Sequence, residues 1–371
     1  MSDKLLFVVT EDWYFVSHRL PLAKAALAQG YDVVIATRVG RHSDVIRNAG
    51  IRLIPFELSR RGGNPFLEIW SLFRLYRRER PKLIHHVAMK PVMFGAIAAR
   101  LDGRVAQVNA IAGLGWLFTS SRLSMRLIRP ILHWVMARLL NCQHSLTIVQ
   151  NTEDGEVLKQ AGVAADHIRL IPGAGVDINV FRPVTNPNQL PCVMLAARML
   201  WAKGVGEFVA AARLLAMRGV EARFLLVGES DPANPTAIPE AKLREWHGQF
   251  GVEWLGRRED MPSVWQTAHI ACLPSYYREG LPKCLLEAAA CGLPIVTTNS
   301  SGCREVIVDG EEGLLVPPKN VEALANSIER LIRQPELRKQ MGGKARERAI
   351  RIFSEEQVIA ATLAIYTEIL Q

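Results

Sequence analysis

The chain has 371 residues, of which 49% are hydrophobic and 22% are charged. This length and composition predict a globular protein of two domains, each with an apolar core. No apolar run reaches about 18 residues, so we do not expect a membrane-spanning helix. The first residues, MSDKLLFVVT, lack a small-residue cleavage site and predict a strand rather than a signal peptide.

Charge is unevenly distributed between the two halves. Residues 1–185 contain 24 Lys and Arg against 14 Asp and Glu, whereas residues 186–371 contain 21 against 22. The net charge of +9 therefore comes from the first half. Such asymmetry favours an anionic partner, either nucleic acid or an anionic lipid surface. The alternative is a basic surface that has no particular partner.

The six cysteines include no Cys-x-x-Cys pair. This pattern predicts reduced, mostly buried thiols in a cytoplasmic protein.

Short apolar runs alternate with longer amphipathic stretches in the first half. Strands are predicted at 4–10, 32–37, 51–56, 83–87, 105–109 and 146–149, with helices at 19–29, 65–78 and 91–101. This alternation predicts a parallel sheet covered by helices on both faces.

The same alternation resumes after a linker-like stretch, TNPNQLP, that follows Pro183. Strands are predicted at 192–197, 222–227, 252–255, 269–273 and 294–298, with helices at 205–217, 241–249, 282–290 and 321–333. We therefore expect an α/β protein of two doubly wound, Rossmann-like domains, 1–183 and 184–353. A last helix is predicted at 354–371, and it either packs back on the first domain or stays apart from it. Ligands bind beyond the carboxyl ends of such strands, so two facing sheets would enclose a cleft.

Polar and glycine residues follow four successive strands of the second half. Arg198 and Lys203 lie in a strand-to-helix loop, where two cations would clamp a diphosphate. Gly228 follows the next strand, Gly256 and Arg257 the one after, and Glu279 the fourth. Each position alone also fits a solvated loop or a plain turn, but together they predict a ligand site at one sheet edge.

Glu279 and Glu287 frame the stretch EGLPKCLLE, in which Pro282 is expected to open a helix. Amides at a helix start can face a phosphate, while carboxylates accept hydrogen bonds from hydroxyls. The stretch therefore suits a phosphorylated, polyhydroxylated ligand. Glu287 taken alone would be an exposed helix glutamate, but its apolar neighbours indicate a carboxylate that needs a partner.

The ordered set of these residues, followed by Gly302-x-x-Glu305 and Asp309-Gly-x-x-Gly313-Leu-Leu-Val-Pro, resembles the retaining glycosyltransferases of family 4. The pattern covers about 120 residues at moderate to high specificity. The resemblance implies the GT-B fold, two facing Rossmann-like domains with an interdomain cleft.

The resemblance also implies a role for each residue of the second half. Arg198 and Lys203 would neutralise the donor diphosphate, helped by the backbone at Gly280, Leu281, Pro282 and Lys283. Glu279 would hold the hydroxyls of the donor sugar, and Glu287 would hold the ribose. Residues near Gly228 and Arg257 would complete the donor site, with Arg257 near the base.

The first half departs from the family at its first loop. Family members commonly carry a Gly-Gly loop there, whereas this chain has TEDWYFVSHR, residues 10–19. His18 is expected either to aim into the cleft or only to open a helix. One histidine of the fourth strand would contact the donor sugar, with His86 preferred over His85, unless both are core or surface residues. Gly113 and Gly115 lie in a loop resembling that of enzymes acting on lipid-linked oligosaccharides.

Residues 121–140 place Arg122, Arg126 and Arg129 at helical spacing among large apolar residues, with Pro130 as a possible kink. This pattern predicts a basic amphipathic helix on an anionic membrane, or a core helix with a solvated basic edge. No Asp-x-Asp pair is found, so neither metal nor another cofactor is expected.

We therefore predict a retaining, metal-independent glycosyltransferase. It would move a hexose-type sugar from a nucleotide-sugar to a glycan acceptor, expected to be polyprenyl-diphosphate-linked, in surface polysaccharide synthesis. It would work in the cytoplasm, at the inner face of the inner membrane. The alternatives are a nucleotide-sugar epimerase of the same architecture and a nucleic-acid or nucleotide-binding module.

Overall fold

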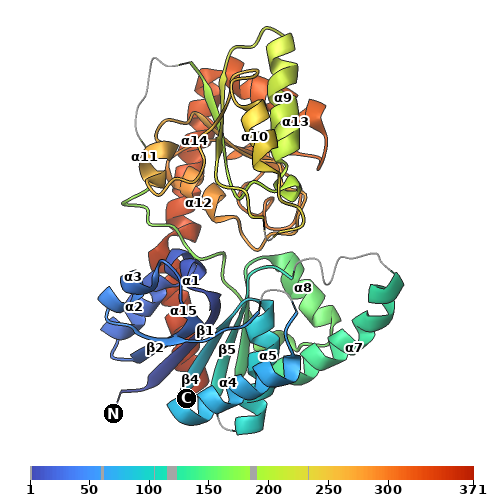
Figure 1. The fold of residues 1–371 in the computed structure, drawn as a ribbon. Coiled ribbons are helices and arrows are strands. Elements are labelled where there is room, and N and C mark those ends of the chain that lie inside the picture. Colours follow the sequence, from blue (N-terminus) through green and yellow to red (C-terminus); the bar gives the residue numbers. More distant parts are fainter. Residues whose placement is uncertain (1, 60–61, 104, 115–122, 184–189, 233) are drawn as a thin grey trace. The chain divides into compact units, whose positions relative to one another are not determined.

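A computed structural model of the protein describes residues 2–59, 62–103, 105–114, 123–183, 190–232 and 234–371, with only the backbone for 123–128 (Figure 1). The chain forms two compact units. One contains Met1–Ala174 and Glu356–Gln371, and the other contains Gly175–Glu355. The division falls upstream of the expected boundary at Pro183, and the last helix belongs to the first unit.

The first unit is built on a seven-stranded sheet of order β3-β2-β1-β4-β5-β6-β7, in which neighbouring strands are parallel. Most of these strands are buried along most of their length, as expected for strands covered on both faces. The strands are β1 (Lys4–Glu11), β2 (Asp32–Arg38), β3 (Arg52–Pro55), β4 (Leu83–Val87), β5 (Ala106–Ile111), β6 (Ser145–Val149) and β7 (Ile168–Leu170).

Helices cover the two faces of this sheet separately (Figure 1). Side chains such as Leu5 and Phe7 pack on one face against α2 and α15, whereas Leu6 and Val8 pack on the other against α4 and α5. The helices on the first face are α1 (Asp12–His18), α2 (Leu20–Ala28), α3 (Ser43–Asn48) and α15 (Glu355–Leu370); those on the second are α4 (Pro65–Glu79), α5 (Met89–Asp102), α7 (Leu123–Leu140) and α8 (Thr152–Gln160).

The segment after β1 differs from the sequence prediction. Residues 12–18 form helix α1 instead of a loop, and the predicted next helix is α2. The Asp12 carboxylate stabilises this start by accepting hydrogen bonds from the backbone amides of Gly40 (2.8 Å) and His42 (2.9 Å). A side chain at residue 40 would meet that carboxylate, because an added Cβ would lie 2.8 Å from its oxygen.

The second unit contains a six-stranded parallel sheet of order β10-β9-β8-β11-β12-β13. Its strands are β8 (Cys192–Ala196), β9 (Arg223–Val227), β10 (Val252–Trp254), β11 (Ile270–Leu273), β12 (Ile295–Thr298) and β13 (Gly313–Val316). Its helices are α9 (Val205–Met217), α10 (Glu240–Trp246), α11 (Met261–Trp265), α12 (Lys283–Ala290), α13 (Val321–Arg333) and α14 (Pro335–Arg348). It also contains a short 3-10 turn at Trp201–Lys203 and a π turn at Ala349–Phe353. A second 3-10 turn, Ala165–His167, belongs to the first unit.

Among the described residues, no helix combines the length and apolar character that crossing a membrane requires.

Candidate functional site

The centre of the candidate site is an ion pair between Lys203 and Glu279 in the second unit. Lys203 ends the short turn after β8, and Glu279 lies in the loop after β11. The two loops touch at Gly204, whose φ is +75° and where an added Cβ would lie 2.1 Å from the carbonyl oxygen of Pro274. Only glycine tolerates this approach, which brings the lysine to the carboxylate.

Both members of this pair are largely buried. The side chains of Lys203 and Glu279 are 15% and 12% exposed. Ser275 Oγ lies 3.0 Å from Glu279 Oε1 and 3.2 Å from the carbonyl oxygen of Ala202, which ties the carboxylate to both loops. Burial by itself lowers the pKa of Lys203, but the charge and the hydrogen bond of Glu279 raise it, so that the net shift of this pKa is upward. The site therefore holds a firmly charged lysine.

Helix α12 begins beside this pair. Gly280, Leu281 and Pro282 are buried, and the helix starts at Lys283. Gly302, in the loop after β12, packs against the same segment, because a Cβ there would lie 2.3 Å from the carbonyl oxygen of Gly280. The partial positive charge of a helix amino end is thus fixed next to Lys203.

Glu287 lies one turn into α12 and is half-buried. Trp265 Nε1 donates a hydrogen bond to Glu287 Oε2 at 3.1 Å. Burial raises the pKa of Glu287, while the nearby Lys283 and the Trp265 hydrogen bond lower it, and the net shift is upward. This carboxylate would gain from further hydrogen-bond donors such as hydroxyls.

Arg198 lies in the same loop as Lys203 but has a different partner. Its guanidinium is exposed and pairs with Asp231 at 3.0 Å. Asp231 was not predicted as a partner of Arg198, because it follows β9 in an irregular segment. Since an exposed pair of this kind is weak, Arg198 can exchange Asp231 for an anionic ligand at little cost.

Gly228 joins the ends of three strands. Its amide donates to the carbonyl of Gly256 at 2.8 Å, and its carbonyl accepts from Trp254 Nε1 at 2.8 Å. With φ at +142° and an added Cβ only 1.9 Å from the carbonyl oxygen of Ala197, no side chain fits there. Arg257 extends from this junction and pairs with Glu229 at 3.3 Å.

A pocket of about 540 Å³ opens at the same strand ends. Its lining residues are Glu229, Ser230, Pro232, Asn234, Ala237, Pro239, Glu240 and Trp254. The predicted donor residues do not line this pocket; they lie beyond the carboxyl ends of β8, β9, β10 and β11 and at the start of α12. Ser275, Trp265 and Asp231 are the neighbours that sequence reasoning missed.

Both histidines of β4 are buried within the first unit, which agrees with the alternative of core residues rather than with the preferred contact to a donor sugar. They point to opposite faces of the sheet, as the strand alternation predicts. His86 is 0% exposed, with Nε2 2.9 Å from Tyr76 Oη and Nδ1 2.8 Å from Asn109 Oδ1. His85 is equally buried and is hydrogen-bonded to Tyr366 Oη of α15.

Helix α5 closes over His86, because a Cβ added at Gly95 would lie 2.2 Å from Nε2. Burial lowers the pKa of His86 to about 4, although the hydrogen bond to Asn109 opposes the shift. The ring is therefore neutral near pH 7 and has both nitrogens occupied, so His86 is a core residue. The strand periodicity could not reveal this, because it does not say which face a helix covers.

The structure describes two of the three predicted acceptor residues, His18 and Gly113. His18 ends α1, is half-buried and stacks on Tyr14 with 4.1 Å between ring centroids. Gly113 follows β5 with φ at +94°. Gly115 and Arg122 lie outside the described residues, as does the side chain of Arg126.

Helix α7 runs without interruption through Pro130. Arg129 is half-buried, whereas Ile131 and Trp134 are exposed.

Two family models match the sequence. The model described as "Glycosyl transferases group 1" matches residues 177–348, and "Glycosyl transferase 4-like" matches residues 4–150. The N,N'-diacetylbacillosaminyl-diphospho-undecaprenol alpha-1,3-N-acetylgalactosaminyltransferase of Campylobacter jejuni is 28% identical over 369 residues, 95% of each chain. The UDP-Gal:alpha-D-GlcNAc-diphosphoundecaprenol alpha-1,3-galactosyltransferase of Escherichia coli is 25% identical over 274 residues, 70% of this chain and 69% of that one.

Solved structures share the architecture. A glycosyltransferase from Rickettsia africae superposes with a TM-score of 0.81 at 19% identity, covering 100% of this chain and 99% of that one. HepE of Anabaena, in complex with UDP, gives a TM-score of 0.80 at 19% identity, covering 99% and 100%. At this identity the likeness shows the fold alone, and it confirms the predicted GT-B fold.

Proposed function

The chain belongs to the group 1 glycosyltransferases with a glycosyltransferase 4-like first half, and we propose that it moves a hexose-type sugar from a nucleotide-sugar to a polyprenyl-diphosphate-linked glycan. The names of the Campylobacter and Escherichia relatives support this acceptor, because both specify undecaprenol diphosphate. A relative from Staphylococcus aureus, 21% identical over the whole chain, is named for capsular polysaccharide biosynthesis. The product would thus enter a surface polysaccharide such as O-antigen or capsule.

The observation that carries the proposal is the Lys203–Glu279 pair at the start of α12. A donor diphosphate placed there would meet Lys203, the amino end of α12 and, across the loop, Arg198. Glu279, held by Lys203 and Ser275, would accept hydrogen bonds from hydroxyls of the transferred sugar. Glu287 would take the ribose, and Arg257 would lie on the side of the base.

The proposed chemistry is a substitution at the anomeric carbon. The bond between that carbon and the donor phosphate oxygen breaks, and an acceptor hydroxyl forms the new glycosidic bond on the same face. The hydroxyl proton passes to the departing nucleoside diphosphate. Lys203 and Arg198 stabilise the charge that develops on this phosphate. Lys203 and Ser275 hold the Glu279 carboxylate, which suits it to orient the sugar rather than to attack it.

We propose that the reaction requires no metal ion, since these cations and the helix amino end supply the positive charge. Turnover should be unchanged after dialysis against EDTA. A loss of turnover that Mg²⁺ restores would contradict this part of the proposal.

The acceptor lipid implies work at a membrane surface, so we propose peripheral contact with anionic lipid at the cytoplasmic face. The basic first half supports this contact through its charge.

A thermal-shift panel of nucleoside diphosphates and their sugar conjugates tests the donor site, because a ligand that prefers the folded state raises the melting temperature. A matching conjugate should stabilise the protein more than its free diphosphate. Incubation of that conjugate with and without a lipid-linked acceptor then separates the alternatives. Release of an epimer without acceptor would favour an epimerase, and no shift with any conjugate would overturn the donor site.

A further inference from the structure

Helix α4 presents large apolar side chains to solvent. Phe66, Leu67 and Trp70 are 80%, 64% and 55% exposed, although the opposite side of the helix buries Leu72 and Tyr76 in the core. The exposed stripe continues through one polar residue, Ser71, to the arginines of the second half of the helix, Arg74, Arg77 and Arg78. One side of α4 is thus apolar at its start and cationic at its end.

No carboxylate interrupts this stripe. Glu68 turns away to pair with Lys90 at 2.6 Å and with the Ser59 hydroxyl at 2.8 Å. Glu79 is buried and pairs with Arg52 and Arg78. Arg77 has a long contact of 3.7 Å with Asp102. Within the described part of the chain Arg74 has no ion pair, so the stripe keeps a net positive charge.

A helix cap and a contact between two aromatic rings stabilise the start of α4. The Asn64 side chain caps α4 by accepting from the amide of Phe66 at 3.0 Å, with Pro65 at the first helical position. The rings of Trp70 and Phe73 stack with 5.2 Å between centroids. The cap and the ring contact therefore stabilise the helical turns that carry the exposed apolar groups.

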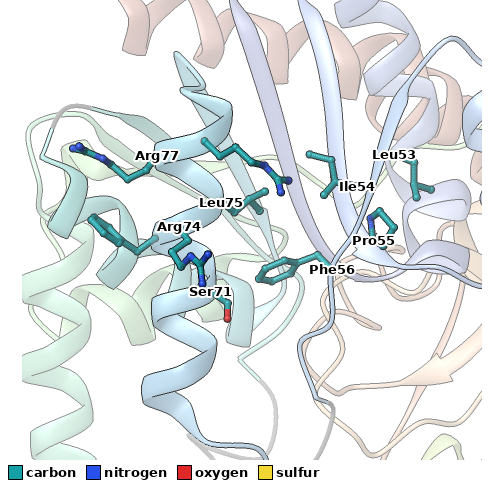
Figure 2. A pocket seen from close by; sticks show the side chains of 10 residues that line it. Leu53, Ile54, Pro55, Phe56, Ser71, Arg74, Leu75 and Arg77 are labelled. Carbon is teal, nitrogen blue, oxygen red and sulfur yellow. The ribbon is translucent and has the colours of Figure 1, made fainter.

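A pocket of about 830 Å³ adjoins the stripe, between α4 and the edge strand β3 (Figure 2). Figure 2 shows Ile54 and Phe56 on the side of β3, and Arg74 and Leu75 on the side of α4. The other lining residues are Leu53, Pro55, Ser71, Phe73, Arg77 and Arg78. An apolar lining beside arginines suits a molecule with a hydrocarbon part and an anionic head.

We propose that this face of α4, with the adjoining pocket, docks on an anionic lipid bilayer. Aromatic and leucine side chains would enter the interfacial layer, while the arginines would bind lipid phosphates. A membrane fits better than a protein, because the exposed side chains of the stripe are apolar, cationic or the single Ser71, while the neighbouring acids Glu79 and Asp102 are buried or half-buried. The purpose of docking rests on the proposed function, since it would bring the enzyme to its lipid-linked acceptor.

Co-sedimentation with vesicles tests the surface without any substrate. The wild type should bind vesicles of phosphatidylcholine with phosphatidylglycerol and bind poorly to phosphatidylcholine alone. Changing Arg74→Gln, Arg77→Gln and Arg78→Gln together should weaken binding by about 100-fold, since each basic residue near an anionic surface contributes about fivefold. Changing Phe66→Ser, Leu67→Ser and Trp70→Ser should also reduce it, with the melting temperature unchanged.

A matched control removes three exposed basic residues of the second unit by Arg330→Gln, Lys339→Gln and Arg351→Gln. This control should bind vesicles as the wild type does. If the control loses vesicle binding to the same extent, the loss comes from overall net charge rather than from α4, which would contradict the proposal. Vesicle binding as strong as the wild type in both α4 variants would also overturn it. So would loss of binding only in the variant Arg122→Gln, Arg126→Gln, Arg129→Gln, which would assign the contact to residues 121–140.

The thermal shift with a nucleotide-sugar keeps the two proposals apart. The α4 variants should retain that shift, and they should also retain transfer to a detergent-dispersed acceptor. A protein that binds vesicles through α4 but gives no shift would leave the docking surface intact and overturn the donor site.

Discussion

Lys203 and Glu279 form a largely buried ion pair although 76 positions separate them in the chain. The pair joins the loops after β8 and β11, which are neighbours in the sheet. It therefore stabilises the contact of the two loops and presents a fixed cation next to a fixed carboxylate. A ligand with a diphosphate beside hydroxyls matches both groups.

Replacing this lysine should affect both turnover and stability. Lys203→Ala should lower turnover by roughly 10²–10³, the scale of one preorganised charge-stabilising group. It should also cost about 1–3 kcal/mol of unfolding free energy, because Glu279 loses its partner while buried. Steady-state kinetics and thermal denaturation check the two effects. A loss of turnover under threefold would remove Lys203 from the site.

Arg198→Ala should separate catalysis from stability. Turnover should again fall by roughly 10²–10³. The unfolding free energy should change by no more than about 0.5 kcal/mol, because the lost pair with Asp231 is exposed. Asp231→Ala is the matched control, since it removes the same pair without removing the cation. If both variants lose turnover equally, the pair rather than the arginine is what matters.

Glu287→Ala should chiefly weaken nucleotide binding. The carboxylate is proposed to accept hydrogen bonds from the ribose, and a hydrogen bond to a charged group contributes about 1.5–3 kcal/mol. Isothermal titration with the free nucleoside diphosphate measures this loss directly. Glu322→Ala, at an exposed helix position, provides the control. Unchanged affinity in Glu287→Ala would contradict the ribose role.

The pH dependence of stability should report on the burial of Glu287. Its pKa is raised in the folded protein, so its charged form destabilises the fold above that pKa. Glu287→Gln should therefore raise the melting temperature of the free protein at pH 7. The advantage should shrink as pH falls through the raised pKa and should be absent below the ordinary value of 4.5. An advantage that does not depend on pH would point to packing instead.

The packing of α5 on β4 should be sensitive to a single methyl group. Gly95→Ala places a Cβ 2.2 Å from Nε2 of His86, so it should cost about 1–3 kcal/mol of unfolding free energy. His86→Ala removes the obstacle, and the double variant should be more stable than the sum of the two losses predicts. Chemical denaturation of the four proteins in this cycle measures the coupling. Strict additivity would show that the ring does not limit this contact.

Much of the fold follows from local patterns. Predicted strands such as 83–87 agree with the structure to the residue, and α9 and α13 have the predicted bounds. A continuous apolar run such as that of β8 identifies a strand that is buried on both faces, because no polar face interrupts it. Helix α1 was missed, since it is only seven residues long and its anchor, Asp12, accepts from amides about thirty positions away.

The sequence by itself determined the order of the strands and helices, the glycines that end strands, and the residue types of the candidate donor site. Only the tertiary structure decided that Lys203 pairs with Glu279 while Arg198 pairs with Asp231, and that His86 is sealed beneath Gly95. It likewise decided that Trp70 faces solvent. The physical reason is that periodicity assigns a side chain to one of two faces, whereas burial and charge partners depend on which distant segment covers that face.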